Sequence, residues 1–170
     1  MTTYYKVTNV DGSACHGGSG KWTPGRWRSV SGALVPCERG LHLCRADQLV
    51  KWLGPVIWEA EVDGEVIDAG DKVVARRARV VRRLDAWNEQ TARHFAADCA
   101  EDALRFAAPD SRETLEVVIH TVRAYADGEA TGADLAAARS AARSAAESAA
   151  WSAAESAQTE RLCALLGIER

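Results

Sequence analysis

The sequence has 170 residues, of which 47% are hydrophobic and 26% are charged, so it can bury a core without metal or disulfide staples. The formal net charge of −3 means that the chain as a whole has no electrostatic attraction to nucleic acid. There is no apolar stretch of the kind that forms a secretory signal or a membrane span. Five irregularly spaced cysteines make a poor disulfide framework, and we expect a soluble cytoplasmic protein with reduced thiols (Cys15, Cys37, Cys44, Cys99, Cys163).

The first predicted elements are a strand and a turn. Residues 4–8 have strand propensity, and residues 9–12 end in Asp-Gly, which is a good hairpin signal. Residues 16–20 contain three glycines, which lose too much backbone entropy in regular structure. We expect a loop there, either mobile or closely approached by another group. Trp22 and Trp27 flank a Pro-Gly turn.

A short helix and a second strand are predicted next. In residues 45–53 the apolar positions share one helical face (Ala46, Leu49, Val50, Leu53). Residues 56–62 alternate, which predicts a half-buried strand followed by a turn at Asp63-Gly64. The inner face takes the apolar residues (Val56, Trp58, Ala60, Val62), and the outer face takes Glu59 and Glu61.

Two charge blocks of opposite sign lie side by side in the sequence. Residues 54–71 contain six acids and no base, and residues 72–83 contain six bases and no acid. The blocks together indicate neighbouring strands whose charges pair across the outer face. Taken alone, the arginines would form a patch for nucleic acid, which stays the weaker alternative (Arg76, Arg77, Arg79, Arg82, Arg83).

The chain changes character at Asp85, a good helix N-cap. We therefore place a domain boundary between residues 1–84 and 85–170. The first helix of the second half should end before Pro109 and bury one stripe (Trp87, Thr91, Phe95, Cys99, Ala103, Phe106). The second should be capped by Asp110 with Glu113, end at Gly128, and bury another face (Leu115, Val118, Ile119, Val122, Ala126).

A third helix is predicted from Thr131, which has Asp134 three residues on, as far as Leu166. Its serines recur every fourth residue from 140 to 156 within an Ala-rich repeat, and Trp151 is the one large residue of that repeat. Two interpretations remain open: the helix packs along its own domain, or it offers a surface to a partner chain or to a second copy.

Two motifs of the second half carry a family resemblance. They are His94–Leu104, with the letters AADCAE, and Val122–Glu129, with the letters VRAYADGE. With the Ala-rich tail, they resemble the Ala-rich immunity proteins of bacterial polymorphic-toxin systems over about residues 87–170. Residues 116–121 depart from that pattern, because Val-Val-Ile-His stands where the family has more Ala and Arg. The resemblance implies a helical domain that binds and neutralises a toxin protein.

The first half carries a second resemblance. Cys37–Cys44, with the letters CERGLHLC, the strand at residues 56–62 and Asp71–Val74 are together similar to an uncharacterised domain of phage and actinobacterial proteins. Members of that group often carry Ala-rich repeat tails. The resemblance predicts fold and context and no particular chemistry.

The sequence offers candidates for three kinds of site: a zinc site, a nucleotide-using enzyme site and a nucleophilic cysteine. Cys37, His42 and Cys44 are possible zinc ligands, but Cys-x4-His-x-Cys matches no common zinc pattern, and two small thiols beside a histidine are the simpler interpretation. The order of elements is loosely similar to ADP-ribosyltransferase folds, which would give roles to the polar residues His16, His42, Glu59 or Glu61. The neighbours Cys15 and His16 would point to opposite faces of a strand, so their adjacency is no evidence for a dyad.

The sequence thus predicts an α+β protein with a small β-rich domain followed by a helical half. The favoured function is binding without catalysis and without a cofactor: the chain would neutralise or sequester another protein, as an immunity protein or a phage-encoded inhibitor does. The predicted partner-binding residues are on the last helix, which is also a possible homo-oligomer contact (Arg143, Glu147, Trp151, Glu155). A nucleotide-using enzyme and a nucleic-acid-binding accessory protein are the alternatives.

Overall fold

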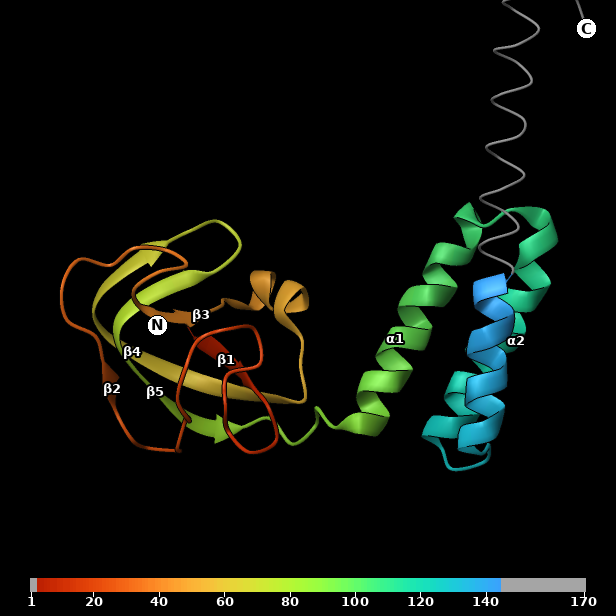
Figure 1. Ribbon diagram of the computed structural model, residues 1–170, viewed down its shortest axis with the longest axis horizontal. Helices are drawn as coiled ribbons and strands as arrows, with labels where there is room; N and C mark the ends of the chain where they lie inside the picture. Colours follow the sequence, from red (N-terminus) through yellow and green to blue (C-terminus); the bar gives the residue numbers. More distant parts are fainter. Residues whose placement is uncertain (1–2, 145–170) are drawn as a thin grey trace, which may run out of the picture. The chain divides into compact units, whose positions relative to one another are not determined.

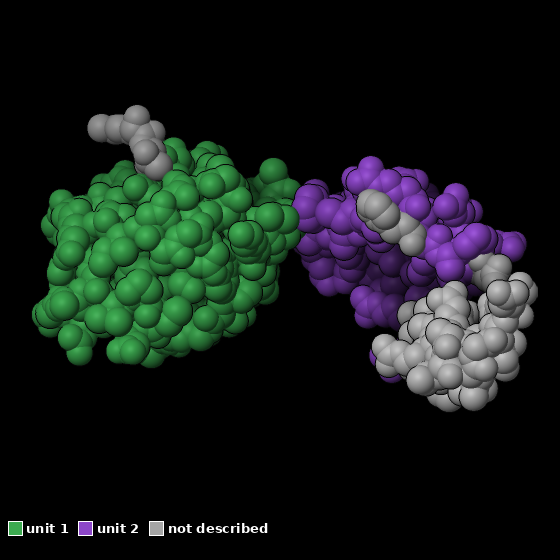
Figure 2. All heavy atoms as spheres, turned by 90° about the horizontal axis from the view of Figure 1, so that it is seen from above, with its two compact units in different colours: residues 1–88 green, residues 89–170 purple. Residues whose placement is uncertain are grey.

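The computed structural model describes residues 3–144 and has an α+β fold, with strands in its first part and helices in its second. It divides into two compact units, residues 1–88 and residues 89–170, which Figure 2 colours separately. The first unit extends beyond the end of the sheet because residues 84–88 are fastened to it. The Leu84 N–H donates to the Ile57 carbonyl at 2.9 Å, and the Trp87 indole donates to the Gly54 carbonyl at 2.8 Å.

Unit 1 is built on one antiparallel sheet (Figure 1). Its strands, in chain order, are β1 (Tyr4–Thr8), β2 (Arg28–Ser29), β3 (Leu41–Leu43), β4 (Val56–Asp68) and β5 (Val73–Arg83). The strand order is β1-β4-β5-β2, and β3 pairs with the start of β5. A bridge between Tyr5 and Cys44 joins β1 to the residue after β3. The sheet therefore curls back on itself, and β1 and β3 become neighbours.

The core of unit 1 lies on the inner face of the curled sheet. It is formed by Trp22 and by buried residues of three strands, β3, β4 and β5 (Leu41, Leu43, Ala60, Val73, Ala75, Ala78, Val80). The inner face predicted for residues 56–62 is confirmed, since Val56 and Ala60 are buried and Trp58 packs against the core. The alternation is incomplete, because Ile57 on the other face is buried as well. The predicted first strand and its hairpin turn are also confirmed: Thr8 pairs with Ala14, and Gly12 has a φ of 82°.

The predicted pairing of opposite charges across two strands is confirmed. The register of β4 and β5 places three acids directly opposite three arginines: Glu59 opposite Arg82, Glu61 opposite Arg79, and Asp63 opposite Arg77. The side chains form ion pairs in each case, at 2.6 Å for Glu61–Arg79 and 2.8 Å for Asp63–Arg77. Glu65 pairs with Arg76 in the same way.

The turn expected at Asp63-Gly64 is wrong, because β4 continues through it to Asp68. The register with β5 shifts between Asp63 and Val66, and Gly64 has a φ of 77°, so this dipeptide forms a bulge. The chain turns later, where the Ala69 N–H donates to the Lys72 carbonyl at 2.9 Å. Asp-Gly supplies the same left-handed conformation to a bulge as to a turn, which explains the misplacement.

The helix expected at residues 45–53 is a 3-10 helix, η1 (Ala46–Trp52), and the predicted apolar face is wrong. Its buried residue is Gln48, whereas Val50 is 60% exposed. The Gln48 side chain accepts the Arg45 N–H at 2.9 Å and donates to the Gly70 carbonyl at 2.9 Å. A period of three residues, set by these polar contacts, replaces the α-helical period of 3.6.

Unit 2 contains α1 (Glu89–Ala103), the short η2 (Leu104–Phe106), α2 (Pro109–Ala126) and a helical segment at 132–144. None of the helices in the described part of the chain is long and apolar enough to cross a membrane. The first helix begins four residues after Asp85, and its predicted buried stripe is wrong. Ala97 is the buried residue, while Thr91, Phe95 and Cys99 are exposed. Its contact with α2 includes ion pairs of Arg123 with Asp98 and Glu101, which apolar spacing does not reveal.

The predicted buried face of α2 is confirmed. Ile119 is buried, and the other four positions of that face are half-buried. The start of the helix differs from expectation, because Ala108 is the N-cap and Pro109 is the first helical residue. Gly128 follows the helix with a φ of 78°, as expected of a terminating glycine.

The predicted start of the third helix is also confirmed. The Thr131 N–H and hydroxyl donate to the Asp134 carboxylate at 2.8 and 2.6 Å. Leu135 and Ala138 are buried in the segment that follows, and Arg143 is exposed near the end of the described residues. The predicted partner-binding residues Glu147, Trp151 and Glu155 lie outside the described residues.

Candidate functional site

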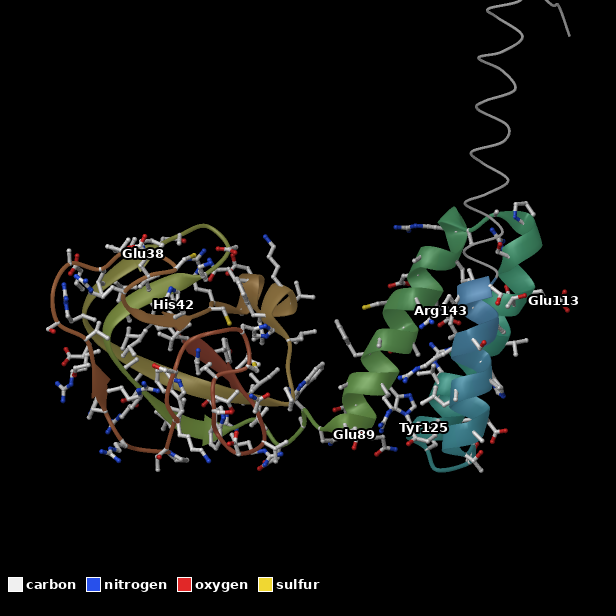
Figure 3. The ribbon with its side chains drawn as sticks, in the orientation of Figure 1. Glu38, His42, Glu89, Glu113, Tyr125 and Arg143 are labelled. Atoms are coloured by element: carbon white, nitrogen blue, oxygen red, sulfur yellow. The ribbon has the colours of Figure 1, made fainter. Side chains whose placement is uncertain are left out.

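A cleft of about 550 Å³ opens in unit 1 between β1, β3 and the loops around them. The glycine loop at 16–20 forms part of one wall, and residues 37–40, just before β3, form another. Figure 3 labels Glu38 and His42, both of which line this cleft. Aliphatic lining comes from residues on the strands or directly after one (Val7, Val30, Leu41, Leu43). Four cations line it as well (Lys6, Arg28, Arg39, Lys72).

Lys6 and Arg28 share the ring of buried Trp22. The Lys6 ammonium lies 5.3 Å from the ring centroid, and the Arg28 guanidinium carbon lies 4.9 Å from it. Lys6 also donates to the His42 carbonyl at 2.9 Å, and Arg28 donates to the Ser19 carbonyl at 3.2 Å. Burial lowers the pKa of Lys6. Within residues 3–144, neither of these two cations forms an ion pair with a carboxylate.

The other two cations lie further along the cleft. Arg39 is exposed, and no ion pair joins it to a carboxylate in the described residues. The Lys72 ammonium lies 4.9 Å from the centroid of the Trp52 ring and 3.6 Å from the Asp71 carboxylate. Glu38 is the acidic residue that lines the same cleft. The lining therefore carries a clear excess of positive charge.

His42 anchors one wall of the cleft. Its Nε2 accepts the backbone N–H of Cys37 at 3.0 Å, and Cys37 has the left-handed φ of 69°. Burial, and then the neighbouring charges of Lys6 and Lys72, lower the pKa of His42. The ring is therefore neutral at neutral pH, as an acceptor of an N–H must be. Through this hydrogen bond, His42 supports the loop at residues 37–40.

His16 anchors the opposite wall. Its Nε2 donates to the carbonyls of Trp52 and Leu53, at 2.9 and 3.1 Å, and its ring meets the Trp52 ring edge-on at 5.5 Å. Burial raises the pKa of the neighbouring Cys15 thiol, so this thiol is not activated as a nucleophile. His16 thus supports the structure of the loop.

The possible zinc ligands do not assemble into a metal centre. The described residues contain no group of three or more His, Cys, Asp or Glu side chains placed to hold a metal ion. The Nε2 of His42 is occupied by the Cys37 N–H. The Cys44 thiol is buried, donates to the Tyr5 carbonyl at 3.6 Å, and has a pKa raised by burial to about 11.

The residues weighed for an ADP-ribosyltransferase site are divided between two places. His16 and His42 line the cleft. Glu59 and Glu61 lie on the outer face of the sheet, in ion pairs with Arg82 and Arg79. Glu38, which sequence reasoning did not select, is the acid that the fold brings to the cleft. The arrangement of histidines and glutamate expected for that enzyme class is therefore not formed.

The arginine block weighed for nucleic acid is largely neutralised. Each of its arginines has a carboxylate partner, since Arg83 pairs with Asp85 at 3.4 Å in addition to the four pairs of the sheet. Arg77 and Arg79 also stack on Trp27, at 4.5 and 4.7 Å from its centroid. This surface consists of paired charges and lacks a free basic stripe of the kind that phosphate backbones bind.

The two motifs of the C-terminal resemblance contact each other in unit 2. Arg123 of α2 donates to Asp98 at 2.6 Å and to Glu101 at 2.7 Å, and both acids belong to α1. His94 pairs with Asp127 at 2.9 Å. Tyr125, labelled in Figure 3, lies under the Arg93 guanidinium at 4.7 Å. The charged residues of these motifs therefore join α1 to α2.

The comparison with protein families identifies unit 1. A family model for a domain of unknown function, DUF7666, matches residues 2–92. The chain belongs to this family, and every residue that lines the cleft lies within the match. No curated protein and no solved structure matches the chain significantly.

Proposed function

We propose that this protein acts by binding, and that the cleft of unit 1 receives an anionic group of its ligand. The observation that carries the proposal is the pair of cations on Trp22. Lys6 and Arg28 lie 5.3 and 4.9 Å from one buried ring and have no carboxylate partner in the described residues.

A partly buried cation without a partner is costly, because water no longer solvates the charge fully. The lowered pKa of Lys6 reflects that cost. The chain contains many acids and places them beside the arginines of the outer face. Cations left without acids in a concave, partly apolar site are typical of a binding site whose ligand brings the opposite charge.

Charge-removing variants of the full-length protein test this proposal. Lys6→Met and Arg28→Met should abolish the thermal stabilisation that anions give to the wild type. A ligand present at about 100 times its Kd stabilises a protein by about 2.7 kcal/mol. Lys51→Met is the matched control, because Lys51 is exposed and does not line the cleft. Equal anion responses in all four proteins would contradict the proposal.

For the biological role, we propose sequestration of another protein, as immunity proteins and phage-encoded inhibitors do. The motif resemblance supports this role. The ion pairs of Arg123 also support it, because they join α1 to α2 within the helical unit. The test is affinity capture of the full-length protein from its native host, compared with Trp151→Ala and with Arg143→Glu. A stoichiometric protein that the wild type captures and the folded variants lose would support the role. A protein captured equally by all three would contradict the predicted contact.

A further inference from the structure

The cations of the cleft come from four separate parts of the fold. Lys6 lies on β1, Arg28 on β2, Arg39 before β3, and Lys72 before β5. A single carboxylate is matched by one guanidinium, which binds both of its oxygens. A phosphate ester carries about 1.5 to 2 negative charges and has three acceptor oxygens, so it engages several cations at once. Four cations that line one cleft with a single lining acid, Glu38, favour phosphate over carboxylate.

The rest of the lining is apolar and aromatic. Val7, Val30, Leu41 and Leu43 contribute aliphatic surface, and the half-buried Tyr5 and Trp52 contribute rings. The volume of about 550 Å³ is that of a small-molecule site, for which roughly 300–1,000 Å³ is usual. Inorganic phosphate alone would leave this apolar wall uncovered. The ligand should therefore carry an apolar, planar part next to its charged part.

Resting on the anion site proposed above, we propose that the cleft binds a phosphorylated small molecule with an aromatic ring, of the nucleotide class. Its phosphates lie against Lys6 and Arg28, which both contact the ring of Trp22 and both line the cleft. Its ring lies against the apolar wall. His16 and His42, which are occupied by backbone groups, hold the two walls in place.

The experiment uses the full-length protein with four probes: ADP, pyrophosphate, adenosine and citrate. Affinities are measured by isothermal titration, and thermal shifts serve as a second readout. We expect ADP to bind most tightly, pyrophosphate at least about tenfold more weakly, and adenosine more weakly still. Arg28→Met should weaken ADP about tenfold or more, as loss of a charge-assisted contact does. Lys51→Met should bind as the wild type does.

Two outcomes would overturn the inference. If citrate binds as tightly as ADP, and Arg28→Met weakens both, the cleft is a general anion site and the nucleotide class is wrong, while the proposed function stands. If none of the four probes binds, or if Arg28→Met leaves ADP unaffected, the proposed function fails as well. Lys6→Met serves where Arg28→Met does not fold, because Lys6 is the other cation on the ring of Trp22.

Discussion

Replacing Gly40 with alanine tests how the wall of the cleft is built. Gly40 precedes β3 with a φ of 146°, and a Cβ added there would lie 2.0 Å from Cγ1 of the fully buried Val74. The backbone conformation costs a residue with a side chain about 1–3 kcal/mol. Forcing an extra methyl group into a packed core costs about another 1–3 kcal/mol. We therefore expect Gly40→Ala to lower the free energy of unfolding by about 2–6 kcal/mol.

Urea unfolding followed by tryptophan fluorescence measures this change, because five of the six tryptophans lie in residues 1–88. Gly25→Ala is the matched control. Gly25 also has a positive φ, 75°, but a Cβ there would meet nothing within 4 Å. That variant should lose only the backbone term, about 1–2 kcal/mol. Equal losses at the two positions would refute the reasoning, since Val74 would then not constrain the approach of residues 37–40.

Three further predictions follow from single contacts. Glu61→Arg should lower the free energy of unfolding by about 0.2–1 kcal/mol, because it places two like charges opposite each other across the strands. The double exchange Glu61→Arg with Arg79→Glu should restore that stability. An unchanged urea midpoint in the single variant would contradict the pairing. Thr131→Ala should cost about 1 kcal/mol by removing the cap of the segment 132–144, with lower helical ellipticity on heating, whereas Thr131→Ser should not. Burial lowers the pKa of His42 from its ordinary 6.5, so the unfolded chain takes up a proton at a higher pH than the folded chain does. The stability that is present above pH 6.5 is therefore lost as the pH falls towards the pKa of the folded state. The urea midpoint should fall between about pH 7 and about pH 5.5, and His42→Gln should show a shallower fall.

The elements that sequence predicts well are those whose signal is local. Alternation in residues 56–62 gives the two faces of β4, and the adjacent charge blocks give its pairing with β5. The apolar face of α2 follows from a 3.6-residue period in the same way. In each of these cases the residues that define the pattern are close in the sequence, along one element or along two consecutive ones, so no knowledge of the rest of the fold is needed.

Two of the failures, in α1 and in η1, have a common physical origin in polar contacts. Spacing assigns Phe95 and Cys99 to a buried stripe of α1, yet both are exposed. Ion pairs of Arg123 with Asp98 and Glu101 join α1 to α2. Likewise, η1 is organised by the hydrogen bonds of buried Gln48. An apolar count cannot predict that a charged or amide side chain has its partner on another element.

The cleft could not be predicted because its residues meet only through long-range pairing. Lys6 and His42 are 36 positions apart, and the bridge between Tyr5 and Cys44 brings their strands together. Sequence reasoning selected His16 and His42 for their chemistry, whereas the structure shows that both rings support the walls of the cleft through hydrogen bonds to backbone groups. It passed over Lys6 and Arg28. The available signal was Lys6, the one charged residue of β1. It lies on the same face of the strand as Tyr4, which packs against the core.

Strand register explains why some cations are paired and others are left for a ligand. Arg77, Arg79 and Arg82 stand opposite acids on β4 and are neutralised. Lys6 stands opposite Trp58, and Arg28 stands opposite Ala78, so neither has a carboxylate across the strand. A shift of one residue in either register would move these side chains to the other face of the sheet. The absence of a carboxylate partner for Lys6 and Arg28 is therefore a property of the strand pairing, and a variant that alters the register of β1 should lose anion binding and stability together.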